Sequence, residues 1–335
     1  MDKNAYIGCL LGTAVGDALG LPYEGLSARR GAKLFPDTAR HHLLFGKGMV
    51  SDDTEQACFV AQAIIRADGD VDIFRKRLAR SLRWWLLGLP AGVGLATLRA
   101  IIKLWLGISP EKSGVFSAGN GPAMRSPVIG VAYGHDPEKL RQFVRASTEI
   151  THSDPKAYYA ALAVALAAYQ SATEETPSAA RFIATLRDLL SGEGARELRE
   201  LLERPADTAN GISGYSYHTV PYVLQTWFME PEDFATGLQK IIRAGGDTDT
   251  AGAIYGGIAG ARVGKSGIPA NWLANIIEWP RSMAWVERLG EALGRREQSA
   301  NVKCPVYFKT GVLLRNLVFL VTVLVHGFRR LAPPY

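Results

Sequence analysis

Apolar side chains recur at helical spacing along almost the whole chain. Residues 157–168 show this spacing, and Asp154 and Pro155 before them are typical of a helix N-cap and first turn. Period-two alternation and a βαβ rhythm are not recognisable, so the sequence predicts an all-α protein, a compact single-domain bundle of many helices. Near the N-terminus, one helix face is formed by Ile7, Leu10, Leu11, Ala14, Val15, Ala18 and Leu19.

Three long segments interrupt the helical pattern. Residues 20–52, 108–136 and 205–219 are rich in Gly, Pro, Ser and Asn, which favour turns over helix interiors. We expect these segments to be loops and to carry the functional residues.

Two predicted helices carry a glycine at every fourth position. Each interior glycine costs a helix about 1 kcal/mol relative to alanine, so a ridge of glycines indicates backbones that approach closely. Similar spacing occurs in membrane helix dimers, but Asp17 and Arg262 favour tight packing in a soluble core. We therefore expect both helices at the centre of the fold. The glycines are Gly8, Gly12, Gly16 and Gly20 in the first helix, and Gly252, Gly256, Gly260 and Gly264 in the second.

The C-terminal segment is more apolar than the rest of the chain. Its uninterrupted core, Leu317 to Val325 with Thr322 as the one polar residue, is about half of the roughly 20 residues that span a bilayer. We predict a main domain over residues 1–300 and an apolar helical extension over 301–335. The extension is expected to pack on the body or lie at an interface, with a spanning helix as the alternative.

Composition and charge narrow the function classes. The chain has 335 residues, 47% hydrophobic and 21% charged, with a net charge of +6. Its basic residues are scattered and form no stripe or known module, which argues against nucleic-acid binding and suits an anionic small molecule or protein modification. Three cysteines without CxxC spacing fit a reducing cytoplasm, and the N-terminus lacks a signal-peptide pattern. We expect a cytoplasmic monomer, with weak membrane association through residues 311–331 left open.

The stretch "GGDTDTAG" places two carboxylates and two hydroxyls within four residues, 247–250. A helix cap could account for one of these side chains, Asp247 or Asp249, at the start of a helix near Thr250. The remaining oxygens exceed what one cap needs. Hard divalent cations such as Mg²⁺ prefer oxygen ligands, so metal binding is the competing interpretation.

A second acidic cluster, "SDDTE" at residues 51–55, also follows a glycine-containing loop and precedes an amphipathic helix. Acids at a helix start can simply suit the helix dipole. Two acidic clusters that met without a counter-charge would repel, however, and one or two Mg²⁺ or Mn²⁺ ions would resolve that repulsion. A third acid, Glu24 in "GLPYEG", follows the first glycine-rich helix.

Five motifs occur in a fixed order along this helical chain: "GDALGLPYEG", "SDDTE", "GNGPAMR", "THSDP" and "GGDTDT". Together, over residues 5–265, they resemble the ADP-ribosylglycohydrolase family, and most of all its dinitrogenase-reductase-activating members. The resemblance implies an all-α catalytic domain over residues 1–300 around two Mg²⁺ or Mn²⁺ ions. It also implies hydrolysis of the bond between ADP-ribose and a modified residue, or of a related ADP-ribosyl compound.

The resemblance also implies roles for individual residues, with Asp249 as the bridge between the two ions and Thr248 pointing away from them or bracing the loop. The implied metal ligands are Ser51, Asp52, Asp53, Asp247, Asp249 and Thr250. The implied catalytic residues are Glu24, Asp52, Asp53 and Asp249. The implied substrate-binding residues are Gly119, Asn120, Gly121, His152, Gly214 and Tyr215.

The chemistry of the glycine loop is consistent with this assignment. Gly119 and Gly121 let backbone N–H groups approach an anion closely, and Asn120 can hydrogen-bond a ribose hydroxyl. Arg125 could offset phosphate charge or form a structural contact. His152 could contact the substrate or be structural.

The most direct functional prediction is hydrolytic removal of ADP-ribose from arginine in a modified protein. One alternative is a hydrolase of serine-linked or other O-linked ADP-ribose, or of a free ADP-ribosyl compound. Another is a catalytically silent ADP-ribose-binding member, although the complete acidic set argues against it. The general acid is not identified by sequence.

Overall fold

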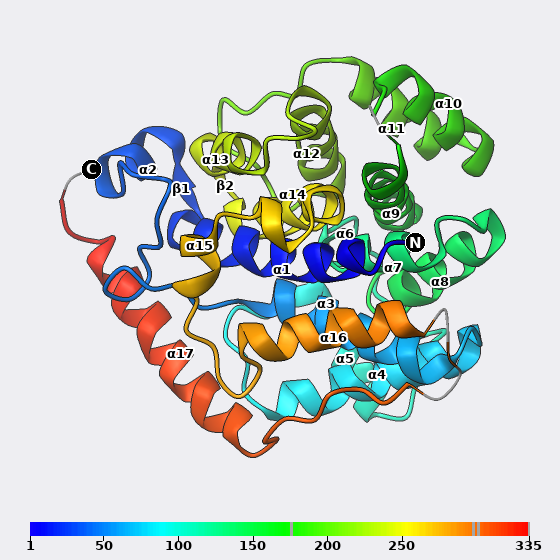
Figure 1. Ribbon diagram of the computed structural model, residues 1–335, viewed down its shortest axis with the longest axis horizontal. Helices are drawn as coiled ribbons and strands as arrows, with labels where there is room; N and C mark the ends of the chain where they lie inside the picture. Colours follow the sequence, from blue (N-terminus) through cyan, green and yellow to red (C-terminus); the bar gives the residue numbers. More distant parts are fainter. Residues whose placement is uncertain (175–176, 297–298, 300–301, 334–335) are drawn as a thin grey trace.

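The two glycine-ridged helices, α1 (Lys3–Gly20) and α14 (Thr248–Val263), lie side by side at the centre of the fold (Figure 1). The structure is a computed structural model that describes residues 1–174, 177–296, 299 and 302–333. A Cβ atom at Gly12 would lie 2.1 Å from the carbonyl oxygen of Gly256, and one at Gly16 would lie 1.9 Å from that of Gly252. The glycines therefore allow a backbone-to-backbone contact that no other residue would permit, and the predicted central pair is confirmed.

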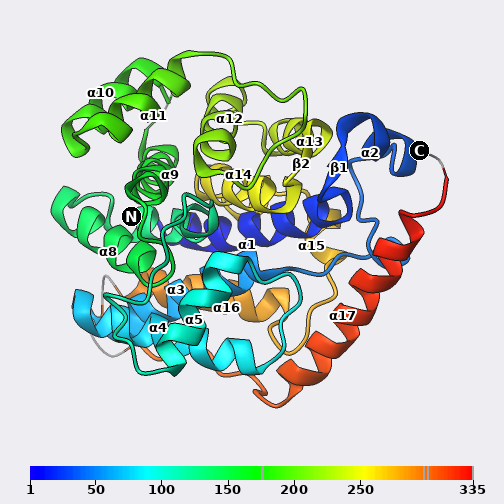
Figure 2. The same cartoon turned by 180° about the vertical axis from the view of Figure 1, so that it is seen from behind.

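Most of the remaining helices surround this pair, so the all-α prediction is also confirmed. On one side lie α9 (Pro155–Thr173), α10 (Ala179–Leu189), α11 (Glu193–Glu203), α12 (Ser216–Met229) and α13 (Phe234–Ala244) (Figures 1 and 2). On the other lie α3 (Asp52–Ala67), α4 (Val71–Leu87), α5 (Leu95–Trp105) and α16 (Met283–Arg295). Helices α7 (Pro127–Tyr133) and α8 (Pro137–Glu149) pack against the α9 layer. Short turns complete the body at η2 (Lys265–Gly267) and α15 (Ala270–Ala274).

Helix starts follow the local signals that the sequence carries. The Asp154 side chain accepts a hydrogen bond from the backbone N–H of Lys156, and Pro155 occupies the first turn of α9, as predicted. Ser51 similarly caps α3 by accepting from the N–H of Asp53. These caps fix where the two helices begin.

The three predicted loops are wrong in part, because each contains short regular elements. The segment 20–52 holds η1 (Leu21–Tyr23), β1 (Leu26–Ser27) and α2 (Ala28–Leu34), and the segment 108–136 holds α6 (Gly121–Met124) and α7. The third segment ends early, because α12 begins at Ser216. Strand β1 pairs antiparallel with β2 (Gly245–Gly246), and two residues per strand are too few for a visible alternation.

The C-terminal helix α17 (Gly311–Arg329) lies along the outer edge of the molecule (Figure 1). By length and composition, two helices of the described chain could cross a bilayer: Lys3–Tyr23, whose most apolar 18 residues are all buried, and Gly311–Arg329, whose most apolar 18 residues are one-third buried. Burial of the first reflects its central place in the bundle. The second contacts the body through one face only.

Candidate active site

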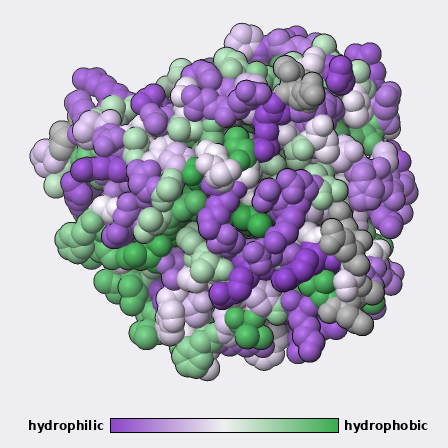
Figure 3. Space-filling view, viewed as in Figure 1, coloured by the Kyte–Doolittle hydropathy of each residue, from purple (hydrophilic) through white to green (hydrophobic). Residues whose placement is uncertain are grey.

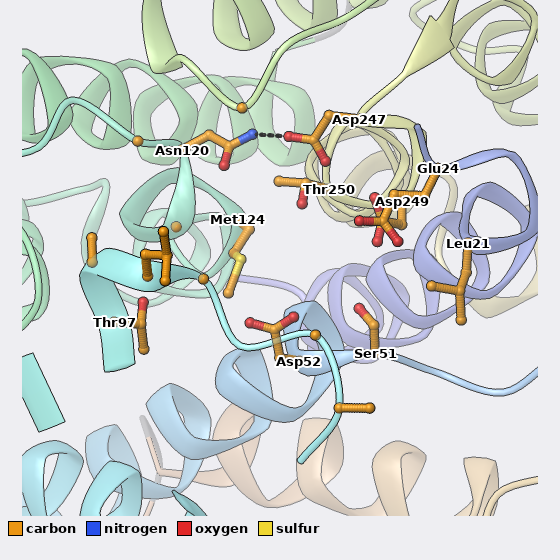
Figure 4. Close-up of a pocket in the computed structure, with 18 of the residues that line it drawn as sticks. Leu21, Glu24, Ser51, Asp52, Thr97, Asn120, Met124, Asp247, Asp249 and Thr250 are labelled. Carbon is orange, nitrogen blue, oxygen red and sulfur yellow. Dashed lines mark hydrogen bonds between the residues drawn. The ribbon is translucent and has the colours of Figure 1, made fainter. Parts of the chain in front are cut away.

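A pocket of about 410 Å³ opens where the N-terminal ends of α3 and α14 meet (Figure 4). Ser51 and Asp52 come from the start of α3, and Asp247, Asp249 and Thr250 face them from the start of α14. The structure thus brings together two acidic segments that are nearly two hundred residues apart in the sequence. The pocket is also lined by Leu21, Glu24, Ala91, Leu95, Thr97, Ser117, Gly119, Asn120, Gly121, Met124, His152, Gly214, Phe319 and Val323.

The Gly245–Gly246 pair fixes the start of α14. Gly246 lies in a narrow space: its carbonyl accepts from Gly25 N–H at 2.7 Å, and a Cβ atom on it would lie 2.0 Å from the carbonyl oxygen of Ile212. Both glycines have positive φ, +73° and +82°, a region that favours glycine. These contacts therefore fix the position of the Glu24 segment relative to the acidic turn at residues 247–250.

The aspartates of the α14 turn do not cap their helix. Asp247 occupies the N-cap position, but its side chain accepts no capping hydrogen bond. Its carboxylate oxygen Oδ2 accepts instead from Asn120 Nδ2 at 2.6 Å. Thr248 braces the turn by donating to the carbonyl of Gly20 at 2.9 Å, as predicted. The acids at the start of α14 are thus left available to the pocket.

Asp53 joins the two acidic segments. Its Oδ2 accepts hydrogen bonds from Ser51 Oγ at 2.9 Å and from Thr250 Oγ1 at 3.4 Å. Its other oxygen, Oδ1, is buried and has no hydrogen-bond partner within the part of the chain that the structure describes, and the same is true of Asp249 Oδ1. Unpartnered buried carboxylate oxygens are costly unless a cation binds them.

Burial and mutual repulsion raise the pKa of the acids at this site. Burial, followed by the charges of neighbouring carboxylates, raises the pKa of Asp52, Asp53 and Asp249 well above the usual range. Glu24 is exposed at the mouth, but protein atoms surround its carboxyl group, and this burial and the charge of Asp247 raise its pKa. A cluster of this kind gains stability when positive charge enters it.

The donor set fits a hard divalent cation, since it consists of carboxylate and hydroxyl oxygens and includes the two unpartnered carboxylate oxygens. Within the described ranges, however, no three His, Cys, Asp or Glu side chains converge into a compact metal-binding group. Hydroxyl groups and water would therefore have to complete the coordination. The binuclear centre stays a prediction.

Asp17, on α1, supports the α3 turn and was not assigned a role from the sequence. Its fully buried carboxylate accepts from the backbone N–H groups of Ser51, at 2.9 Å, and Thr54, at 3.2 Å, and from the Thr54 hydroxyl. Burial raises its pKa to about 7, although these hydrogen bonds oppose the shift. The only available sequence signal was a carboxylate within an apolar glycine-rich helix.

The predicted substrate segments lie next to one another. The loop at 117–121 pairs with the segment at 214–216 through a bridge between Gly119 and Tyr215, and Asn120 N–H donates to the carbonyl of Gly214 at 3.0 Å. Gly119, Asn120, Gly121 and Gly214 line the pocket, whereas Tyr215 is half-exposed beside it. The hydroxyl of Tyr215 instead accepts from Lys156 Nζ at 3.1 Å.

His152 lies in the pocket wall below the glycine loop. Burial and the nearby Arg125 guanidinium lower its pKa to about 3, so the imidazole is neutral near pH 7. Its Nδ1 is paired with Thr151 Oγ1 at 2.9 Å. A neutral ring can offer the substrate one hydrogen bond through Nε2 but cannot serve as a general acid.

Arg125 makes structural contacts. The sequence had left open whether this residue offsets phosphate charge or has a structural role. It is fully buried and donates to Gln56 Oε1 at 2.7 Å, to Thr151 Oγ1 at 2.7 Å and to the carbonyl of Ser147 at 2.8 Å. Gln56 in turn donates to Asp52 Oδ2 at 2.9 Å. Arg125 therefore orients Asp52 and His152 through their neighbours, and burial lowers its pKa to about 10.

Helix α17 forms part of the pocket, which the sequence did not indicate. Phe319 and Val323 line the cavity, and Phe319 packs with Leu21, Leu43 and Met49. The motif pattern ends near residue 265, and an apolar helix gives no signal of which side chains will reach a pocket.

The same helix holds the first acidic segment and the Glu24 turn in place. Arg315 donates to the carbonyl of Val50 and forms a buried ion pair with Glu278, whose carboxylate accepts from the N–H of Val50 at 2.8 Å. At the other end, Arg330 donates to the carbonyls of Glu24 at 2.6 Å and Pro22 at 3.0 Å. The C-terminal helix thus supports the turn before Ser51 and the turn that carries Glu24.

We expect Arg330→Ala to lower kcat/KM about tenfold, mainly through kcat, because the turn that holds Glu24 loses three hydrogen bonds to its carbonyls. Steady-state kinetics would measure the effect. Arg329→Ala is the matched control, since Arg329 is exposed and lies over the Phe35 ring instead. Equal activities of the two variants would show that the turn does not need Arg330.

Comparison with known proteins defines the class. The ADP-ribosylglycohydrolase family profile matches residues 2–302, so the chain belongs to the ADP-ribosylglycohydrolase family. The name of the family describes hydrolytic release of ADP-ribose from a glycosidic bond. Helix α17, residues 311–329, lies beyond the matched segment.

Individual relatives match over nearly their whole length. An uncharacterised protein of Archaeoglobus fulgidus is 33% identical over 82% of this chain and 92% of its own. ADP-ribosyl-[dinitrogen reductase] glycohydrolase of Rhodospirillum rubrum is 28% identical over 81% and 89%, and human ADP-ribosylhydrolase ARH3 is 27% identical over 80% and 88%. A solved ADP-ribosylglycohydrolase-related protein complex superimposes with a TM-score of 0.70 at 28% identity, covering 88% of this chain and 98% of that one.

Proposed function

We propose that this enzyme hydrolyses the N-glycosidic bond between ADP-ribose and an arginine side chain of a modified protein. The observation that carries the proposal is the meeting of two acidic segments in one pocket, with unpartnered oxygens on Asp53 and Asp249, beside a glycine loop suited to an anion. Hydrolytic removal of ADP-ribose is the activity common to the family. The arginine linkage and the metal requirement are the parts proposed here.

The residues that would hold two Mg²⁺ or Mn²⁺ ions are Ser51, Asp52, Asp53, Asp247, Asp249 and Thr250. Such cations, when bound, supply Lewis acidity that lowers the pKa of a water molecule. The glycine loop would bind the diphosphate, because Gly119 and Gly121 have no side chains that keep an anion away from the backbone, and Ser117 Oγ, which accepts from the N–H of Gly119 at 3.3 Å, lines the same pocket. Asn120 Nδ2 is committed to Asp247 and Thr219, so its amide oxygen is the atom that would accept a ribose hydroxyl.

Glu24 is the residue to which we assign proton transfer. It stands at the mouth of the pocket, and burial and the charge of Asp247 raise its pKa, which favours the protonated carboxyl group relative to an ordinary glutamate. His152 is unsuited to this role because its pKa is about 3. Glu24 would therefore exchange a proton with the leaving group or with the attacking water.

One observation supports arginine as the linkage. The half-exposed ring of Tyr215 follows Gly214 of the pocket wall, and an aromatic face can hold a guanidinium group. One relative is named for dinitrogen reductase, which supports a modified protein as the substrate. Serine-linked or other O-linked ADP-ribose stays the alternative substrate class.

The test is ADP-ribose release from matched peptides that carry the modification on arginine or on serine. We expect faster release from arginine in the presence of Mn²⁺ or Mg²⁺, and loss of release in EDTA that is restored by added metal. Faster release from serine would shift the assignment to the O-linked class. Activity that is unaffected by EDTA would contradict the metal proposal, and no release from either peptide with metal bound would favour a silent binding protein.

A further inference from the structure

Helix α17 packs with its polar face inward and leaves its apolar face in solvent. This reverses the usual arrangement of a surface helix, in which the apolar stripe faces the core. Its buried residues include Arg315, Asn316, Thr322 and His326. Its exposed large apolar residues are Leu313, Leu314, Leu317, Val318, Leu320, Val321, Leu324, Val325 and Phe328.

The inward polar contacts prevent the helix from turning its apolar face to the core. Arg315 pairs with Glu278 with a 3.0 Å hydrogen bond from Nε, and Asn316 donates to the carbonyl of Gly88 at 2.7 Å. A ring nitrogen of His326 pairs with the carbonyl of Pro22 at 3.0 Å. Rotation of the helix would leave these buried groups without partners, which is costly. The outward apolar face is thus fixed by the fold.

The exposed face has the chemistry of a surface that meets a bilayer. Between Gly311 and Phe328 its exposed part carries no charged side chain, whereas the exposed bases Lys309 and Arg329 stand at its two ends. Half-exposed Trp279 and exposed Phe308 lie beside the first turn, with ring centroids 5.9 Å apart. Figure 3 shows the resulting hydrophobic region at the lower left, where α17 lies in Figure 1.

We propose that this face docks on a bilayer that contains anionic phospholipids, with α17 lying in the plane of the interface. The apolar side chains would enter the acyl boundary, while Lys309 and Arg329 meet anionic headgroups and Trp279 sits at headgroup depth. The helix does not span, because the partners of Arg315, Asn316 and His326 are in the protein body.

The charge pattern of the face favours lipid over a second copy of the chain. An uncharged apolar strip with a base at each end, Lys309 and Arg329, and with Trp279 beside its first turn matches the acyl boundary and the anionic headgroups of a membrane. A single amphipathic helix is enough for reversible binding to such a surface.

Docking would also place the active site near the membrane. The inner face of α17 contributes Phe319 and Val323 to the pocket, so the pocket and the lipid would be separated by one helix diameter, about 10 Å. The docking proposal itself does not depend on which bond the enzyme hydrolyses.

The experiment is co-sedimentation of the full-length chain with phosphatidylcholine vesicles and with vesicles that contain about one quarter phosphatidylglycerol. We expect binding to the anionic vesicles, weaker binding to the neutral ones, and about tenfold weaker binding by the double variant Leu317→Glu, Val321→Glu. Met229→Glu is the control, since it adds one acid at an exposed apolar position at the end of α12. Lys309→Glu should reduce the preference for anionic lipid.

Thermal unfolding would verify that these surface variants keep their fold. Absence of binding to either vesicle, or equal binding by wild type and the double variant, would overturn the proposal. Sedimentation velocity would test the alternative occupant. If the wild type is a dimer at micromolar concentration and the double variant is a monomer, the face binds a second copy of the chain and the lipid proposal is wrong.

Discussion

Replacement of Asp249 by asparagine is expected to lower kcat by about 10³-fold, equivalent to roughly 4 kcal/mol of transition-state stabilisation. Asp249 is one of the residues proposed to hold the two cations, and its buried Oδ1 has no hydrogen-bond partner among the described residues. An amide has no negative charge to offer a cation at this position. ADP-ribose release at saturating Mn²⁺ would measure the loss, and activity near that of wild type would refute the binuclear proposal.

The same substitution is expected to stabilise the metal-free protein. Burial and the charges of Glu24 and Asp247 raise the pKa of Asp249 in the folded, metal-free protein above its value in the unfolded chain. Stability is therefore lost as the pH rises from the unfolded-state pKa to the folded-state pKa, and the loss stays constant above it. In EDTA the variant should therefore melt at a higher temperature than wild type, and it should gain less from added Mn²⁺.

The matched control is Asp188→Asn, an exposed helical aspartate on α10. It should change neither kcat nor the melting temperature in EDTA or Mn²⁺. A variant of Asp249 that is less stable than wild type in EDTA would indicate that the carboxylate makes a structural contact that outweighs the repulsion.

The second large effect concerns the central helix pair. Gly256→Ala is expected to lower the free energy of unfolding by about 3 kcal/mol or more, because the added Cβ would lie 2.0 Å from the carbonyl oxygen of Gly12. The neighbour is rigid helix backbone rather than a side chain that can rotate away. Urea denaturation would measure the change, and a midpoint equal to wild type would contradict the packing.

Gly327→Ala on α17 separates this effect from helix propensity. A Cβ at Gly327 meets no atom within 4 Å, so alanine there is expected to leave stability unchanged or raise it by about 0.5–1 kcal/mol. Two glycine-to-alanine substitutions within helices should thus have opposite signs. A loss at both positions would mean that the close approach of α1 and α14 is not the cause.

Part of the site was predictable because its signals are local. "SDDTE" and "GGDTDT" concentrate oxygen ligands at helix starts, so Asp52 and Asp249 could be singled out without a structure. The glycine loop at 117–121 was likewise visible from its composition. The role of Arg125 was left open, because its partners Gln56 and Ser147 are 69 and 22 residues away.

By itself, the sequence determined the helical class, the close pair of glycine helices and the residues of the two acidic turns. These features are encoded locally, because periodicity and composition can be recognised within one or two helical turns. Only the tertiary structure decided that Asp17 holds the Ser51 turn and that Phe319 reaches the pocket. It also decided that the polar side of α17 faces inward. Arg315 finds its ion-pair partner 37 residues away and the carbonyl of Val50 265 residues away. No local pattern encodes such contacts, because they depend on which surfaces the folded chain brings together.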